Sequence, residues 1–327
     1  MARHTKVLNL FLLITVFIIV NHVEIQTRKI HTNRPIIGIL THTSDGWPFA
    51  FMGINFISAS YVKFIESAGA RVVPIFVDRP YNKTLKLLES INGVILPGGT
   101  ANFTSSLYLN KSKEIFEFAV KTYDKGGYFP IMGICLGHQM LAAIVYGHSA
   151  DIRSRTNTLN LTKPLKLQRN YHQTKIFREL PKKLAKEAMK TFSTYHYHMY
   201  SLSTRFMRES KRLREFYRIV ATDVDVDGLE YVSVMEAKNY PIYSMQFHPE
   251  KIQFEWNLQE SIPHTSTAIQ LSQYISNFFV SEAKYSKHKF PSLKEETHEL
   301  IYNYNPSFML PVFSNSSFVQ IYFLDSE

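Results

Sequence analysis

The sequence has only one cysteine, Cys135, in 327 residues, so no disulfide can form within the chain. It has no H-E-x-x-H motif and no Cys/His cluster at metal-ligand spacing, and we therefore expect neither a metal nor another cofactor. It also has no internal repeat, no low-complexity segment and no basic run with interleaved aromatic residues. A disulfide-stapled small fold and a repeat array are thereby excluded, and nothing predicts a nucleic-acid partner.

The composition is that of an ordinary globular protein, with 45% hydrophobic, 14% aromatic and 20% charged residues. Lysine and arginine (37) exceed aspartate and glutamate (27), which gives a formal net charge of +10. This excess favours anionic partners, although a solvated basic surface is the simpler explanation. A chain of this length buries enough apolar surface to fold without disulfides.

The N-terminal residues predict entry into the secretory pathway. Arg3 and Lys6 precede an apolar run over residues 7–20, which is the layout of a signal peptide, and the run is short for a membrane span. We therefore expect a signal peptide at residues 1–24, a linker at residues 25–33, and no stable membrane association. Residues 21–24 lack a small-x-small cleavage pattern, so an uncleaved signal anchor remains an alternative.

Five N-x-S/T sequons follow this segment, at Asn82, Asn102, Asn110, Asn160 and Asn315. A single sequon often arises by chance, but five behind a signal peptide indicate a glycoprotein of the lysosome lumen or the extracellular space. In those compartments an unpaired cysteine is either a buried structural thiol or a reactive one. The neighbours of the cysteine decide between the two.

Short apolar runs alternate with helical periodicity from residue 35 onward. Strands are expected at residues 35–40, 70–76, 93–96 and 128–132, and helices at residues 57–68, 84–90 and 110–125. Strand–helix alternation with short connections predicts a parallel sheet covered by helices on both faces.

The second half of the chain has a different pattern. Residues 151–171 predict a loop or a sheet extension. Later strands are expected at residues 218–223, 231–235 and 242–247, with a turn at Asp227-Gly228, and a closing helix at residues 265–284. The C-terminal extension, residues 289–327, is rich in aromatic residues and is expected to pack on the domain, but the sequence indicates no role for it.

The single cysteine lies in the segment Gly133-Ile134-Cys135-Leu136-Gly137, directly after the fourth expected strand and before a helix. Small residues two positions before and after a central nucleophile are the layout of a nucleophile elbow, here with cysteine in place of serine. The glycines permit the sharp turn, and the N-terminus of the following helix favours a thiolate. Cys135 is therefore predicted to be a reactive thiol.

Two further segments follow the ends of expected strands. Gln246-Phe247-His248-Pro249-Glu250-Lys251 contains a histidine that can take the thiol proton and return it to a leaving amine, with a carboxylate to orient its ring. Leu96-Pro97-Gly98-Gly99 can direct a backbone N–H at a developing oxyanion, a role that the Leu136 N–H would share. Taken alone, each segment has a plainer explanation, a packing histidine and an ordinary loop turn.

Together, in this order, the three segments resemble the class I glutamine amidotransferase superfamily, and within it the chain is similar to the gamma-glutamyl hydrolases. The closer similarity covers about residues 34–284. It rests on R-P-I-I-G-I-L at residues 34–40, A-S-Y-V-K at 59–63, E-S-A-G-A-R-V-V-P at 66–74, S-I-N-G at 90–93, Y-F-P at 128–130 and Y-P-I-Y at 240–243. The resemblance implies a flavodoxin-like three-layer α/β sandwich with a mostly parallel central sheet, over a domain of residues 34–288.

The resemblance also implies a role for each matching position. The nucleophile, the general base and acid, and the acidic triad member would be Cys135, His248 and Glu250. Further positions would line the oxyanion hole or the substrate: Gly99 and Leu136 the oxyanion hole, and Gly98 and His198 the substrate. The implied reaction is hydrolysis of γ-glutamyl amide bonds in folate (pteroyl) poly-γ-glutamates through a cysteine thioester, without a cofactor. The partner would be this small-molecule substrate, and either a monomer or a homodimer is compatible with it.

Two alternatives remain open. A glutamine amidotransferase-like amidase or glutaminase would share all three segments. His138-Gln139 favours it, because an aromatic residue commonly follows the elbow glycine in the hydrolases and this chain has the amidotransferase pair instead. The expected signal peptide and the lack of a synthase domain favour the hydrolase. The other alternative is a non-catalytic secreted binding protein, against which the intact Cys135, His248 and Glu250 argue.

Overall fold

The computed structural model describes residues 29–147, 151–310 and 317–325. The chain divides into two units, Met1–Ile30 and His31–Glu327, and every element below belongs to the second. The expected signal peptide at residues 1–24 and the sequon at Asn315 lie outside the described residues. Within those residues, no helix combines the length and the apolar character that crossing a membrane requires.

The main sheet takes its strands from both halves of the chain. Its seven strands, in spatial order, are β4 (Arg71–Ile75), β1 (Ile36–Leu40), β5 (Gly93–Leu96), β6 (Ile131–Ile134), β11 (Ile242–Met245), β10 (Glu230–Ala237) and β9 (Tyr217–Val224). The first five strands pair in parallel, and β10 pairs antiparallel with both β11 and β9. The order of the first five is that of flavodoxin-like folds, so the prediction of a mostly parallel central sheet is confirmed.

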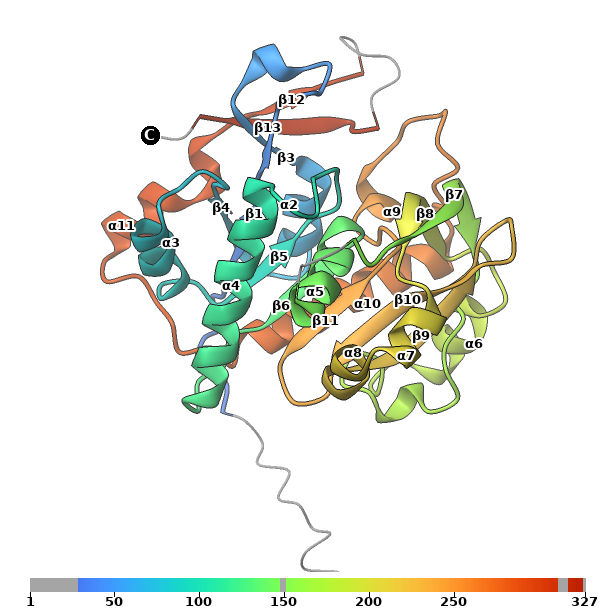
Figure 1. Ribbon diagram of the computed structural model, residues 1–327. Helices are drawn as coiled ribbons and strands as arrows, with labels where there is room; N and C mark the ends of the chain where they lie inside the picture. The colour runs from blue at the N-terminus through green and yellow to red at the C-terminus, as the bar shows by residue number, and fades with distance from the viewer. Residues whose placement is uncertain (1–28, 148–150, 311–316, 326–327) are drawn as a thin grey trace, which may run out of the picture. The chain divides into compact units, whose positions relative to one another are not determined.

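Helices cover both faces of this sheet. Successive residues of a buried strand point to opposite faces, so an apolar strand needs cover on each side. In β1, Ile37 and Ile39 belong to one hydrophobic core, and Ile36 and Leu40 to the other. Figure 1 shows α4 and α5 in front of the sheet and α10 behind it. The first core contains α2 (Ala59–Glu66), α6 (Lys182–Ala188) and α10 (Ser266–Ala283), and the second contains α3 (Tyr81–Leu88), α4 (Leu107–Asp124), α5 (Leu136–Tyr146), α7 (Thr204–Glu209) and α8 (Lys211–Phe216). The predicted three-layer sandwich is therefore confirmed.

Smaller elements complete the described part of the chain. One further sheet has the strand order β12 (Pro306–Phe308), β13 (Gln320–Leu324), β3 (Asn55–Ser58) and β2 (His42–Thr43), and another pairs β7 (Ser154–Lys163) with β8 (Thr194–Ser201). The short helices are η1 (Ala50–Met52), η2 (Tyr171–Gln173), α9 (Lys251–Phe254), α11 (Leu293–Glu299) and η3 (Ile301–Asn303). Figure 1 shows β12, β13 and β3 together at the top of the view.

The helix expected at residues 57–68 begins later than its periodicity predicts. Residues 55–58 form β3 instead, because Phe56 and Ile57 pair with Phe323 and Tyr322 of β13. These strands come from opposite ends of the chain, and local periodicity carries no information about such a pairing. The stretch at residues 151–171, left open between a loop and a sheet extension, contains β7.

Buried charged side chains near α9 hold the segment that leads into β13. Glu255, directly after α9, is 1% exposed and accepts hydrogen bonds from the Val319 N–H (2.6 Å) and the Ser58 hydroxyl (3.0 Å). Lys251, the first residue of α9, is also buried and donates to the Ser317 carbonyl (2.8 Å). The C-terminal strand is thus attached to the residues that directly follow Glu250.

Replacing Glu255 with alanine is expected to lower the free energy of unfolding by about 2–4 kcal/mol, because two buried donors lose their acceptor. Chemical denaturation followed by tryptophan fluorescence measures this change. Glu179→Ala is the matched control: the Glu179 side chain is 83% exposed, and its loss should change stability by less than about 0.5 kcal/mol. Equally small effects of both substitutions would show that Glu255 does not hold β13.

Candidate active site

The carboxyl ends of three neighbouring parallel strands bring the predicted catalytic segments together. β5 ends at Leu96, before the Pro-Gly-Gly turn; β6 ends at Ile134, before Cys135; and β11 ends at Met245, before His248. In sheets of this kind, ligands bind outside the carboxyl ends of the strands, where the strand order reverses. Here the order reverses between β1 and β5, so the Pro-Gly-Gly turn lies at the expected binding position.

Cys135 adopts a backbone conformation that non-glycine residues rarely adopt. Its φ of 51° and ψ of −102° join β6 to α5 through a sharp turn. A Cβ on Gly137 would lie 2.0 Å from the Leu96 carbonyl oxygen, and one on Gly133 would lie 2.7 Å from the Gly137 backbone, so the turn needs both glycines. The Cys135 N–H donates to the Met245 carbonyl (2.8 Å), which ties the turn to β11. Helix α5 starts directly after the thiol and presents the positive end of its dipole to it.

His248 and Glu250 reach the same place from the end of β11. His248 Nδ1 lies 2.7 Å from Glu250 Oε1, and both side chains are buried. Burial alone lowers the pKa of His248, but the negative charges of Glu250 and Cys135 outweigh it and raise the pKa to about 10. A Cβ on Gly98 would lie 2.7 Å from His248 Cε1 and 3.0 Å from Cys135 Cβ, so both side chains converge on Gly98. The predicted nucleophile, the predicted base and the carboxylate predicted to orient it are therefore brought together.

Three side chains that the motifs did not indicate fix the Pro-Gly-Gly backbone. The Gly98 N–H donates to Tyr61 Oη (2.7 Å), and the Gly98 carbonyl accepts a hydrogen bond from His42 Nε2 (3.0 Å). Tyr108 Oη donates to the Pro97 carbonyl (2.6 Å). They come from α2, β2 and α4, so no local spacing in the sequence could have grouped them.

The N–H groups of Gly99 and Leu136 differ from that of Gly98. Both backbone polar groups of Gly98 are occupied, whereas in the described ranges neither the Gly99 N–H nor the Leu136 N–H donates a hydrogen bond to the protein. These are the two donors predicted for the oxyanion hole. His42 packs on this backbone, because a Cβ on Gly99 would lie 2.6 Å from its ring, and it stacks on Tyr108 with 4.7 Å between ring centroids. Burial lowers the pKa of His42 to about 4, so the ring is neutral near pH 7.

His198 belongs to β8 and lies close enough to His248 for the charge of His248 to act on it. The His248 N–H donates to the Tyr195 carbonyl of that strand (2.9 Å). Burial, with the charges of His196 and His248, lowers the pKa of His198 well below its usual range. The Thr158 hydroxyl lies 2.8 Å from Nδ1 of His198, and Nδ1 of His196 lies 3.3 Å from its Nε2. His198 is thus a neutral ring near the triad, with both nitrogens in contact with protein groups.

The pair His138-Gln139 fastens the first turn of α5 to neighbouring strands. His138 Nδ1 lies 2.9 Å from the Ser244 hydroxyl of β11, and burial lowers the pKa of His138 to about 3. Gln139 Nε2 donates to the Tyr200 carbonyl of β8 (2.6 Å) and to Gln246 Oε1 (3.1 Å). These residues support the elbow from its buried side.

The remaining predicted positions lie on the surface. Asn82, Asn102 and Asn110 are exposed, as glycan attachment requires. Asn160 is partly buried, and its Nδ2 already donates to the Gln259 carbonyl (3.1 Å), so this sequon is the least accessible of the four described. Among the described residues, no group of three or more His, Cys, Asp or Glu side chains is placed to hold a metal ion.

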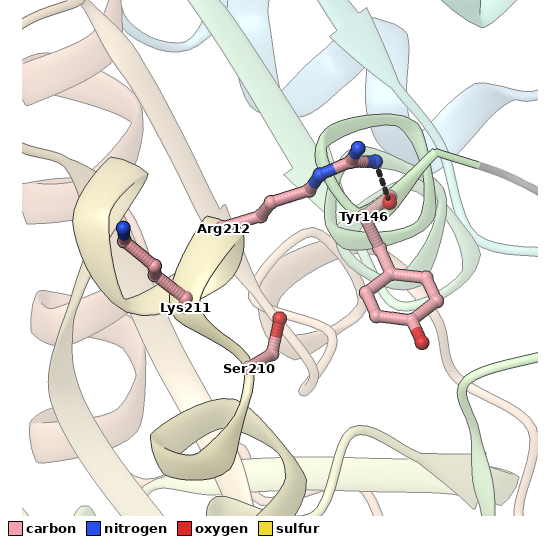
Figure 2. Close-up of a pocket in the computed structure, with 4 residues that line it drawn as sticks. All are labelled: Tyr146, Ser210, Lys211 and Arg212. Carbon is pink, nitrogen blue, oxygen red and sulfur yellow. Dashed lines mark hydrogen bonds between the residues drawn. The ribbon is translucent and has the colours of Figure 1, made fainter.

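A separate open hollow of about 310 Å³ lies at the C-terminal end of α5, the end opposite Cys135. It is lined by Tyr146, Ser210, Lys211 and Arg212. Figure 2 shows Arg212 donating to the Tyr146 carbonyl (2.8 Å), which caps the helix. None of the predicted catalytic residues lines this hollow.

Comparisons with known proteins agree with this arrangement. The family described as Glutamine amidotransferase class-I matches residues 55–259. The chain is 39% identical to "Gamma-glutamyl hydrolase" of Bos taurus over 292 residues, which cover 89% of this chain and 90% of that protein. It is 41% identical to "Gamma-glutamyl hydrolase" of Rattus norvegicus over 292 residues, with the same coverage.

The fold is also similar to that of a solved structure, the glutaminase domain of Trypanosoma brucei CTPS with bound acivicin. The TM-score is 0.50 at 14% sequence identity, and the match covers 79% of this chain and 98% of that one. At this identity the likeness concerns the fold alone.

Gly99→Ala is expected to lower kcat/KM about 100-fold, the effect of displacing one oxyanion donor, because the new Cβ collides with the His42 ring. The double variant His42→Ala/Gly99→Ala gives the Cβ room, so its loss should be smaller than the two single losses combined. Steady-state kinetics of the four proteins measures this coupling. Losses that simply add would show that His42 does not position Gly99.

Glu250→Gln is expected to lower the pKa of His248 from about 10, because the larger of the two charges that raise it is removed while the burial that lowers it remains. A raised pKa stabilises the folded state fully below pH 6.5 and loses this effect as the pH rises to about 10. The wild type should therefore lose more stability than Glu250→Gln over that range. Histidine-selective NMR titration measures the pKa, and exposed Glu179→Gln is the control. An unchanged midpoint in Glu250→Gln would contradict this electrostatic assignment.

Proposed function

Because the chain belongs to the gamma-glutamyl hydrolase family, we propose that it hydrolyses γ-glutamyl amide bonds of folate (pteroyl) poly-γ-glutamates through a cysteine thioester. One observation carries the proposal for the site. Cys135, on a strained turn at the start of α5, and His248, paired with Glu250, converge on Gly98. This arrangement supplies a nucleophile, a proton carrier and two adjacent N–H donors.

The proposed reaction has two stages. The Cys135 thiolate attacks the γ-carbonyl carbon, and the N–H groups of Gly99 and Leu136 donate to the developing oxyanion. Protonated His248 gives its proton to the leaving amine nitrogen as the C–N bond breaks, which leaves a thioester. Water then attacks the thioester and gives a proton to His248, the C–S bond breaks, and the thiolate is restored. Each stage is completed by groups of the chain and water.

The proposal includes the partner and the location. A poly-γ-glutamate carries many carboxylates, so the formal charge of +10 favours its approach. We propose a small-molecule substrate, no nucleic-acid partner and no stable membrane association, with either a monomer or a homodimer as the working unit. The signal-like N-terminus and the exposed Asn82, Asn102 and Asn110 support a glycoprotein of the secretory pathway, in the lysosome lumen or outside the cell.

Incubation of the purified protein with pteroylpentaglutamate and, separately, with glutamine tests the reaction. Mass spectrometry should show shorter pteroylglutamates and released glutamates, with little ammonia from glutamine. Cys135→Ser should lose about 1000-fold or more of this activity at an unchanged melting temperature, because a hydroxyl ionises far less readily than a thiol. Rapid release of ammonia with intact pteroylpentaglutamate would favour the glutaminase, and near-wild-type turnover by Cys135→Ser would refute the nucleophile.

A further inference from the structure

Arg153 lies against two aromatic rings that come from separate segments of the chain. Its guanidinium carbon is 3.6 Å from the centre of the Phe103 ring and 4.6 Å from the centre of the Tyr200 ring. Phe103 follows the Pro-Gly-Gly turn, and Tyr200 lies on β8 two residues after His198. The Arg153 side chain is 15% exposed, so it is held in place yet open to solvent at one edge.

The nucleophile helix fixes the same guanidinium. Arg153 Nη1 lies 3.5 Å from Gln139 Oε1, and the other end of that amide donates to the Tyr200 carbonyl. Gln139 follows Cys135 by one helical turn, which is about 6 Å along the helix axis. The guanidinium is therefore held by the helix that begins directly after the thiol, at a residue one turn into that helix.

Asp151 shows what kind of group this cation binds. Its two carboxylate oxygens accept hydrogen bonds from Arg153 Nε (2.8 Å) and Nη2 (2.6 Å), a fork-shaped contact that suits a carboxylate. The Asp151 side chain is 43% exposed, and an ion pair so open to water contributes little stability. Another carboxylate can replace it at small cost.

Lys251 is a second cation close to the triad in the sequence, and it is already engaged. It is buried, and it donates to Glu260 Oε2 (3.0 Å) and to the Ser317 carbonyl (2.8 Å). Binding a substrate carboxylate there would break contacts that hold the C-terminal segment. Arg153 has the more exchangeable partner of the two.

We propose that Arg153 binds the α-carboxylate of the substrate's γ-glutamyl residue, and that Asp151 occupies this position in the free protein. The inference rests on the proposed function and adds a specificity-determining residue to it. In a γ-glutamyl residue, four carbon–carbon bonds, about 5 Å, separate the attacked carbonyl carbon from the α-carboxylate. A γ-linkage leaves that carboxylate free, whereas an α-peptide bond consumes it. Arg153 would therefore distinguish γ-linked from α-linked glutamate.

Paired substrates test this directly, one γ-glutamyl amide with a free α-carboxylate and the same compound with an α-carboxamide. Arg153→Met should lower kcat/KM about 10- to 100-fold for the carboxylate and leave the carboxamide nearly unchanged, because the lost contact is a charge-assisted hydrogen bond. Arg153→Lys should keep part of the preference, since lysine has the charge without the fork. Asp151→Asn should lower KM for the carboxylate, because it weakens the competing group.

Arg155→Met is the matched control, since it removes the same charge from an exposed side chain two residues away, opposite Tyr200 in the β7–β8 pairing. It should leave both substrates near wild type at a fixed ionic strength. Equal losses on both substrates in Arg153→Met would mean that Arg153 only braces the two rings. Equal losses in Arg153→Met and Arg155→Met would mean general charge attraction, and either result overturns the proposal.

A binding measurement separates this proposal from the proposed function. Calorimetry compares the binding of an N-acyl glutamate γ-amide with the binding of its α-carboxamide. Both compounds are measured with Cys135→Ser and with the double variant Cys135→Ser/Arg153→Met. Tighter binding of the carboxylate, lost with Arg153→Met, would support the α-carboxylate site even if the wild type failed to hydrolyse pteroylpentaglutamate. No preference for the carboxylate, together with normal hydrolysis by the wild type, would refute the Arg153 site and leave the function standing.

Discussion

The close approach of α5 to β5 is the constraint on which the active site depends. Gly137 lies so near the Leu96 carbonyl that a single Cβ would separate the helix from the strand. This contact lets α5 begin immediately after Cys135, and it puts the Leu136 N–H beside the turn that carries Gly99. The strained φ of Cys135 is thus maintained by packing on the residues around it, and not by the cysteine itself.

Charge at the active site is decided by what surrounds each carboxylate. His248 stays protonated near pH 7 because the negative charge of Glu250, whose Oε1 lies 2.7 Å from His248 Nδ1, raises its pKa. His196 also has a carboxylate nearby, with Asp223 Oδ2 at 3.6 Å from its Nε2, yet its pKa lies well below the usual range. Burial is the main cause, and the charge of Lys163, which itself contacts Asp223 at 3.5 Å, adds to it. The two histidines therefore differ because Glu250 and Cys135 both raise the pKa of His248, whereas the carboxylate near His196 is shared with Lys163.

Local pattern predicted most of the main sheet, because buried parallel strands are short apolar runs and the helices between them are amphipathic. The strand at residues 93–96 agrees to the residue, and the closing helix nearly so. β3 was missed because its partner is β13, and nothing within a short window reports a partner so distant. The short helices α6, α7 and α8 were missed as well, since each is too short for a clear period.

The candidate site shows the same difference between residues that lie in a local pattern and residues that are brought in by distant contacts. Cys135, His248 and Glu250 could be predicted as a group because each lies in a recognisable segment at a strand end. Tyr61 and His42 were not predicted, because their contribution is a hydrogen bond to Gly98 from segments in which the sequence indicates no catalytic role. The predicted catalytic residues lie in sequence motifs, whereas the residues that hold a backbone in place are identified by their contacts in the structure.

The attachment of β13 beside α9 can form only late in the synthesis of the chain, because residues 317–319 are made near its end. Glu255 and Lys251 each acquire one of their partners only when residues 317–319, late in the chain, have been made. Until then the contacts of these two buried charges are incomplete, although Ser58 and Glu260 are already available to them. Cys135 is therefore translated long before the contacts of residues 317–319 can form.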